Sequence, residues 1–132
     1  MAYLIDTNIA IHARDGAESV LAKLAEHDGA VLLSALSLVE LQRGLYKNPA
    51  HTALRQVRLK VLVQYIPILP FDAAAAEAYG QIIAQCGWVR GRDYDRMIAA
   101  HAISSGSILV TDNRADFQDI PGLSLENWAT GP

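Results

Sequence analysis

The sequence has 132 residues, which suffice for one domain but would leave two domains undersized. Because 52% of the residues are hydrophobic and 19% are charged, the composition excludes an intrinsically disordered chain. The net charge of −3 argues mildly against nucleic-acid binding, since domains that bind phosphates are usually basic.

The first half of the chain alternates short apolar runs with helical patterns. Asp6, Thr7 and Asn8 are expected to form a turn that ends the first strand. Asn48 followed by Pro49 indicates a helix start, because Asn caps helices and proline is tolerated at the first helical position. The predicted strands are 3–5, 31–33 and 65–69, the last near a sheet edge because it contains a proline, and the predicted helices are 17–26, 34–45 and 48–63.

The second half continues this alternation. Asp72 caps an alanine-rich helix that runs to Cys86, and Gly87 stops it. The remaining predicted elements are a loop at 88–92, a helix from 93 or 94 to about 106, a strand at 107–111, a turn or short helix at 112–117 and a last strand at 123–125. This order predicts one α/β domain over residues 1–132, with a central, mainly parallel sheet in a three-layer α/β/α arrangement.

The single cysteine and the hydropathy pattern suggest a compartment. Cys86 alone cannot form an intrachain disulfide, and one cysteine with four scattered histidines argues against structural zinc, so a metal here would be held by oxygen. Asp6 interrupts the apolar start too early for an export signal, and no stretch is long enough to span a membrane. We therefore expect a soluble cytoplasmic protein.

Acidic residues occupy the positions where a parallel sheet of this kind binds its ligands, beyond the carboxyl ends of the strands. Each one alone is explained by helix capping, by the helix dipole or by exposure to solvent. The candidates are Asp6 after the first strand, Glu40 in the helix after the second, Asp95 in the first turn of a helix, and Asp112 and Asp116 after the strand at 107–111.

If these carboxylates lie close together, the repulsion between their negative charges must be offset. Two of them about 4 Å apart repel by about 4 kcal/mol at an effective dielectric constant of about 20. Either their pKa values rise or a divalent cation binds, and oxygen ligands favour Mg²⁺, or Mn²⁺ as a substitute. Water bound to such a cation can attack a phosphodiester. Four short polar neighbours could hydrogen-bond to the carboxylates, although turn and cap chemistry explains them equally well: Thr7, Asn8, Ser37 and Thr111.

Basic residues gather in two places. Five lie between residues 41 and 71 without a single acid among them, and three lie between residues 90 and 96. They are either solvated helix faces or contacts for a nucleic-acid backbone, and Arg96 could instead pair with Asp93 or Asp95. The two groups are Arg43, Lys47, Arg55, Arg58 and Lys60, and Arg90, Arg92 and Arg96.

Four separated motifs, in order along nearly the whole chain, resemble PIN-domain proteins and, within them, the VapC toxins of bacterial toxin–antitoxin pairs. They are YLIDTNIAI at 3–11, SALSLVELQRG at 34–44, GRDYDRMIAAHAI at 91–103 and ILVTDNRADFQDIPGLSLENW at 108–128. The resemblance implies a PIN-like α/β/α fold, Mg²⁺-dependent endoribonuclease activity, a homodimer, and neutralisation in a hetero-oligomer by a VapB-type antitoxin that covers the cleft.

The resemblance also implies which acids form the site. The family's acidic residues fall on Asp6, Glu40 and Asp95. Relatives of this type often have Asn at position 112 and Glu at position 116, so both Asp112 and Asp116 are candidates for the fourth acid. We rank Asp112 first because it directly follows the strand.

Two other functions fit parts of the pattern. A phosphatase with Asp6 as nucleophile would need a second acid two residues later, where the chain has Asn8, and no glycine-rich phosphate loop is present. A PIN-fold module that binds RNA or protein without catalysis is the main alternative. Retention of all the acids argues against it, because unused buried carboxylates are costly.

Overall fold

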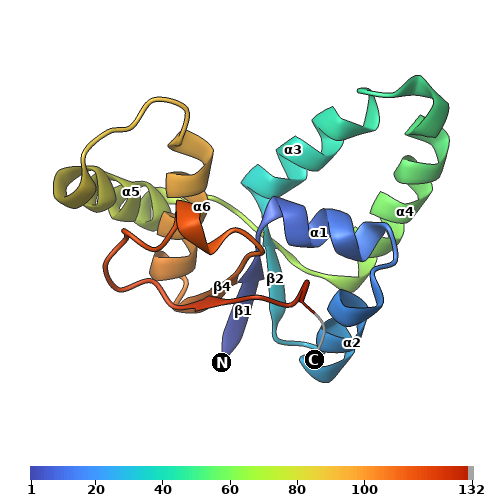
Figure 1. Ribbon diagram of the computed structural model, residues 1–132, viewed down its shortest axis with the longest axis horizontal. Helices are drawn as coiled ribbons and strands as arrows, with labels where there is room; N and C mark the ends of the chain where they lie inside the picture. The colour runs from blue at the N-terminus through green and yellow to red at the C-terminus, as the bar shows by residue number, and fades with distance from the viewer. Residues whose placement is uncertain (131–132) are drawn as a thin grey trace.

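Five short strands form an all-parallel sheet with helices on both faces (Figure 1). The structure is a computed structural model, and it describes residues 1–130. The sheet order is β3-β2-β1-β4-β5, with β1 (Ala2–Ile5), β2 (Val31–Ser34), β3 (Ile68–Leu69), β4 (Ser107–Val110) and β5 (Leu125–Glu126). The helices are α1 (Thr7–Arg14), α2 (Glu18–Glu26), α3 (Ala35–Leu45), α4 (Thr52–Tyr65), α5 (Ala73–Cys86) and α6 (Asp93–Ser104), and the short 3₁₀ helices are η1 (Pro49–His51) and η2 (Arg114–Asp116).

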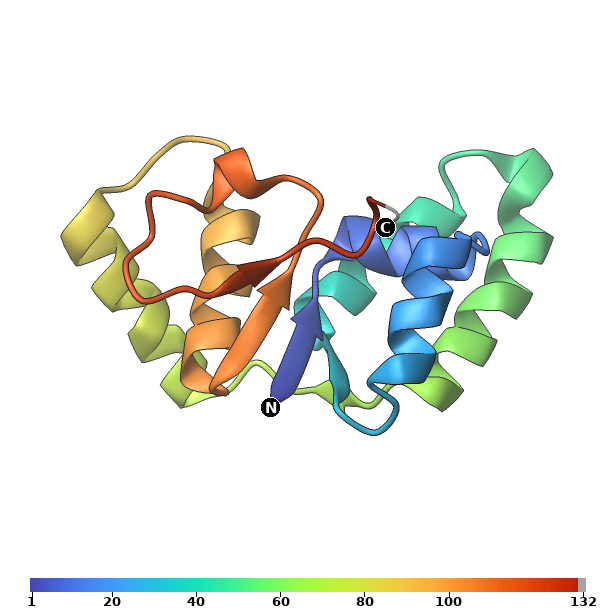
Figure 2. The same cartoon turned by 60° about the horizontal axis from the view of Figure 1, so that its bottom comes forward.

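Alternation along the central strands divides the core into two layers. Ile5 and Val110 point to the face covered by α1, α2, α3 and α4. Their neighbours Leu4 and Leu109 point to the opposite face, which α5 and α6 cover. Figure 2 shows the sheet between these two groups of helices. The three-layer α/β/α fold and its parallel sheet are therefore confirmed, since strands buried on both faces need apolar residues throughout.

The strand order positions the functional edge. The chain runs from β1 to β2 on one side and later returns to β4 on the other side of β1, so the order reverses between β1 and β4. In open parallel sheets, ligands bind at such a switch point, beyond the carboxyl ends of the strands. Asp6 and Asp112 follow β1 and β4 at this edge, and Ser34 at the end of β2 leads into the helix that carries Glu40.

Two predictions from the sequence were wrong. The expected turn at 6–8 is instead the start of α1, because Asp6 ends the strand and caps the helix at once, which removes any connecting loop. The last strand lies at Leu125–Glu126 and not at 123–125. The other predicted elements are found within a few residues of their expected bounds, and none of the helices within residues 1–130 is long and apolar enough to cross a membrane.

Candidate functional site

Asp6 is the most buried of the predicted acids, with 8% of its surface exposed. Its carboxylate accepts a hydrogen bond from the Ile9 amide at 2.9 Å and one from the Thr111 hydroxyl. Burial raises the pKa of Asp6 to about 6, the two hydrogen bonds oppose the rise, and the charges of Asp112 and Asp95 add to it. Asp6 therefore lies in a site that disfavours negative charge.

Glu40 approaches the same site from α3. The Thr7 hydroxyl donates to its carboxylate at 2.5 Å, which joins the start of α1 to α3. Arg43, one turn later, is 3.7 Å from the other carboxylate oxygen. The expectation that Thr7 hydrogen-bonds to a carboxylate of the site is thus met, as it is for Thr111 on Asp6.

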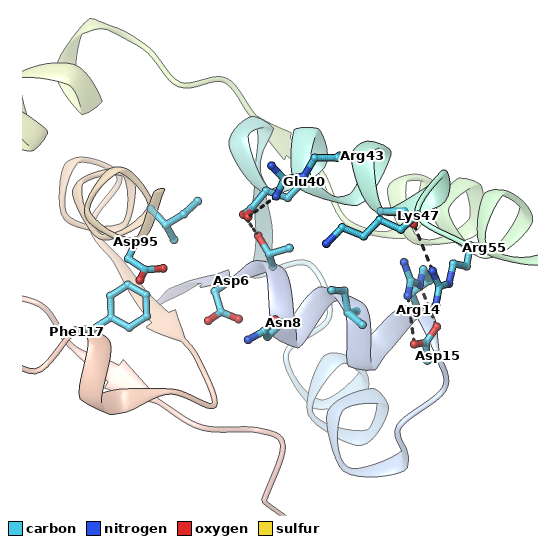
Figure 3. A pocket seen from close by; sticks show the side chains of 14 residues that line it. Asp6, Asn8, Arg14, Asp15, Glu40, Arg43, Lys47, Arg55, Asp95 and Phe117 are labelled. Atoms are coloured by element: carbon cyan, nitrogen blue, oxygen red, sulfur yellow. Dashed lines mark hydrogen bonds and ion pairs between the residues drawn. The ribbon is translucent and has the colours of Figure 1, made fainter. Parts of the chain in front are cut away.

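Asp95 supplies the third carboxylate from the first turn of α6. Partial burial is the main cause that raises its pKa, and the charges of Asp116 and Glu40 raise it further, while Arg92 lowers it. Residues distant in sequence are therefore close enough to influence one another's ionisation. Figure 3 shows Asp6, Glu40 and Asp95 around one open space, each from a different helix start or helix face.

Asp112 and Asp116 lie beside this space but do not line it. Asp112 is 3.0 Å from the His12 imidazole. Asp116 accepts a hydrogen bond from the Asn113 side-chain amide at 2.5 Å and lies 3.8 Å from the Arg92 guanidinium. Both acids thus have side-chain partners of their own, and the charge of Asp112 acts on Asp6 while that of Asp116 acts on Asp95.

The three central carboxylates line a cavity of about 470 Å³ that is mixed in character. Apolar side chains form part of its wall, and cations form the end opposite Asp95 (Figure 3). Besides the acids, the lining includes Asn8, Ile11, Ile98, Phe117, the ion pair of buried Arg14 with exposed Asp15, and the basic residues Arg43, Lys47 and Arg55. An anionic chain could pass from the cations to the carboxylates within this cavity.

Only some of the basic residues predicted to contact a nucleic acid border the cavity. Arg43, Lys47 and Arg55 border the cavity, whereas Arg58 lies 3.9 Å from Asp15. Arg96 is only 3% exposed, and its guanidinium pairs with Asp119 at 3.2 Å. The expectation that Arg96 contacts a nucleic acid or pairs with Asp93 or Asp95 was therefore wrong, because α6 buries that side chain against the segment after η2.

The donor set fits a hydrated divalent cation. Within residues 1–130, no three Asp, Glu, His or Cys side chains form a group that could enclose a metal ion by themselves. Mg²⁺ commonly binds through one or two carboxylates and keeps several of its waters, which an open cavity can accommodate. A cation near Asp6 and Asp95 would also offset the cost that raises both pKa values.

A buried hydrogen bond connects the helices that carry Glu40 and Asp95. Ser34 caps α3 by accepting from the Leu36 amide at 3.1 Å, and its hydroxyl lies 2.8 Å from Nδ1 of His101 in α6. Burial lowers the pKa of His101, so the ring is neutral at pH 7 and Nδ1 can accept the Ser34 proton. This contact fixes the distance between α3 and α6.

Replacing Ser34 with Ala should lower the free energy of unfolding by about 2–3 kcal/mol, because it removes the cap and leaves the buried His101 nitrogen without a partner. Urea unfolding at pH 7.5 (about one unit above the ordinary histidine pKa) measures the change. The exposed Ser104→Ala is the control, since that hydroxyl bonds only to a carbonyl of its own helix. Equal stability of the two variants would contradict a structural role for Ser34.

Sequence reasoning missed the part of the cavity wall that α1 provides. Thr7, Ile11 and Arg14 recur at spacings of four and three residues, which is the period of one helix face. That spacing was available as a signal, but the expected turn at 6–8 concealed it. The pairing of His12 with Asp112 was missed for the same reason.

Known proteins of one family are similar to nearly the whole chain. Residues 3–123 match the PIN domain family. Ribonuclease VapC2 from Rickettsia felis is 34% identical over 97% of this chain and 98% of the relative. The tRNA(fMet)-specific endonuclease VapC from Shigella flexneri is 35% identical over 98% of this chain and 99% of the relative. A chain of the crystal structure of VapBC2 from R. felis, bound to a DNA fragment from their promoter, has a TM-score of 0.86 at 32% identity and covers 97% of this chain and 99% of its own length.

Proposed function

Because the chain belongs to the VapC ribonucleases of the PIN-domain family, we propose that its acidic cavity cleaves RNA and that a VapB-type antitoxin restrains this activity. The observation that carries the proposal is the convergence of Asp6, Glu40 and Asp95 on one cavity at the switch point of the sheet. The chain is thus an endoribonuclease toxin of a toxin–antitoxin pair. We place it in the cytoplasm, where its RNA and its antitoxin are made. We also propose that it forms a homodimer.

Asp6, Glu40 and Asp95 would hold Mg²⁺ with its waters, and Asp112 or Asp116 would serve as the fourth acid. The bound cation supplies the positive charge that a pentavalent phosphate and its leaving oxygen require. A carboxylate of the site that does not bind the cation would take the proton from the attacking water. Thr7 orients Glu40, and Thr111 orients Asp6.

The basic end of the cavity supports RNA as the substrate. Arg43, Lys47 and Arg55 lie across the cavity from Asp95, so a strand whose phosphates lie on these cations would extend toward the acids (Figure 3). The relative from S. flexneri is named for tRNA(fMet), which makes that RNA the first substrate to test.

Cleavage of labelled tRNA(fMet) or total RNA by the purified chain should stop in EDTA and return with Mg²⁺ or Mn²⁺. We also expect Mg²⁺ to raise the melting temperature of the wild-type chain, because it relieves repulsion among the carboxylates. Sequencing of the RNA ends identifies the cut site. Cleavage that persists unchanged in EDTA, or the absence of any cleaved RNA with both cations, would contradict the proposal.

An apolar groove provides a surface for the antitoxin. It has a volume of about 330 Å³ between α2 and α4, and exposed apolar residues line it, among them Leu21, Val57, Val61 and Tyr65. Patches of this kind on a small protein mark binding sites for partners. Arg14 borders both this groove and the acidic cavity. We propose that an apolar segment of the antitoxin fills the groove and extends past Arg14 to the carboxylates.

A further inference from the structure

The loop between α5 and α6 exposes a tryptophan that the chemistry described above does not use. Trp88 is 60% exposed, whereas the other tryptophan, Trp128, is 1% exposed. Tryptophan is enriched at contact surfaces because its ring offers a large apolar area while its N–H keeps a hydrogen bond. Arg90 is exposed in the same loop.

The indole of Trp88 is held in place along one edge. Its Nε1–H donates to a carboxylate oxygen of Asp93 at 3.1 Å, and the Tyr79 hydroxyl donates to the same oxygen at 2.8 Å. Tyr79 belongs to α5 and Asp93 to α6, so two helices fix the orientation of the ring. Binding of a partner to the ring therefore costs little side-chain conformational entropy.

Trp88 lies near the end of α6 that carries Asp95. Its anchor Asp93 is in the same first turn of α6 as Asp95, which lines the cavity. Figure 1 shows the loop joining α5 to α6 on one side of the molecule, while α3 and α4, which carry Arg43 and Arg55, lie on the other. Arg92 of the loop pairs with Asp116, so this end of α6 combines one aromatic ring with positive charge.

We propose that Trp88 stacks against an unpaired base of the RNA where the strand leaves the cavity on the α6 side, with Arg90 contacting the adjoining phosphate. An exposed, oriented indole flanked by arginines matches the chemistry of single-stranded nucleic acid, in which every base offers a flat face and every linkage a negative charge. The inference rests on the proposed ribonuclease function and deepens it, because it makes the substrate single-stranded at this position. A base-paired segment would keep its faces stacked and inaccessible.

Tryptophan fluorescence tests the contact directly, because one tryptophan is exposed and the other is buried. In the cleavage-inactive Asp6→Asn background, a short mixed-sequence single-stranded RNA should quench the emission, and the same sequence in a duplex should not. Trp88→Phe should abolish the quenching and keep most of the affinity. Trp88→Ala should weaken single-strand binding by about 5- to 150-fold. Val89→Ala, a partly exposed neighbour in the same loop, is the matched control and should bind normally.

In the active chain, Trp88→Ala should raise the KM for single-stranded RNA while kcat changes little. Quenching by the duplex equal to that by the single strand would overturn the inference. An unchanged affinity of Trp88→Ala for single-stranded RNA would overturn it as well. Emission that changes with protein concentration without RNA would assign the ring to a second copy of the chain and would overturn it too. If the wild-type chain cleaves RNA in these cases, the ribonuclease function still stands. That function fails only if the wild-type chain with Mg²⁺ cleaves no RNA.

Discussion

Asp6→Asn should abolish RNA cleavage, by at least about 100-fold, and should make the fold more stable above pH 6. The reason is that burial raises the pKa of Asp6 from 3.8 to about 6. Between these two pKa values the folded chain keeps the Asp6 proton that the unfolded chain loses. The contribution of Asp6 to the free energy of unfolding is therefore fully present below pH 3.8 and is lost as the pH rises through 6. The difference between the two pKa values corresponds to about 3 kcal/mol.

Asparagine is the appropriate replacement because its side-chain oxygen can still cap α1 by accepting from Ile9. Urea unfolding in EDTA measures the effect: we expect a gain approaching about 3 kcal/mol well above pH 6 and almost none below pH 3.8. Asp15→Asn is the opposite control. Arg14 lowers the pKa of Asp15, so neutralising this acid should destabilise the fold near pH 7. Cleavage by a folded Asp6→Asn chain would refute the assignment of the site.

Val61→Glu should release the toxin from its antitoxin while leaving RNA cleavage intact. Val61 is 61% exposed and lines the apolar groove, so the free chain tolerates the charge. In the complex, the same carboxylate would be buried against an apolar segment without a partner, which should weaken binding by at least about 100-fold. Co-purification and titration calorimetry with the antitoxin encoded beside the toxin gene measure the loss.

A control on the same helix separates charge from position. Gln56→Glu adds an exposed carboxylate to α4 outside the groove, and it should bind the antitoxin normally. In cells, co-expressed antitoxin should rescue growth with Gln56→Glu but not with Val61→Glu. Rescue of both variants would show that the antitoxin binds elsewhere.

Much of the fold could be predicted because its signals are local. A few adjacent residues suffice to predict the apolar strands, the Asp72 cap of α5 and the end of α5 at Gly87. Parallel pairing follows from the alternation of strands and helices. The missed helix α1 shows the limit of this approach. Its start coincides with the end of a strand at Asp6, so no loop residues mark the boundary.

The candidate site could be predicted only in outline. Strand ends placed Asp6 and Asp112 at one edge, but which acids line the cavity depends on side-chain directions that spacing does not determine. Arg96 illustrates the same difficulty. Arginine is seldom buried, and its partner Asp119 lies 23 residues later in the chain, so neither its burial nor its pairing has a local signal.

The position of Arg14 between the two cavities has a kinetic consequence. Because Arg14 lines both the groove and the acidic cavity, an inhibitor anchored in the groove can extend into the cavity without any propagated change of shape. Antitoxin and RNA would then compete for the same cavity. The potency of the antitoxin should decline as the RNA concentration rises, which is the behaviour of competitive inhibition and not of an allosteric lock.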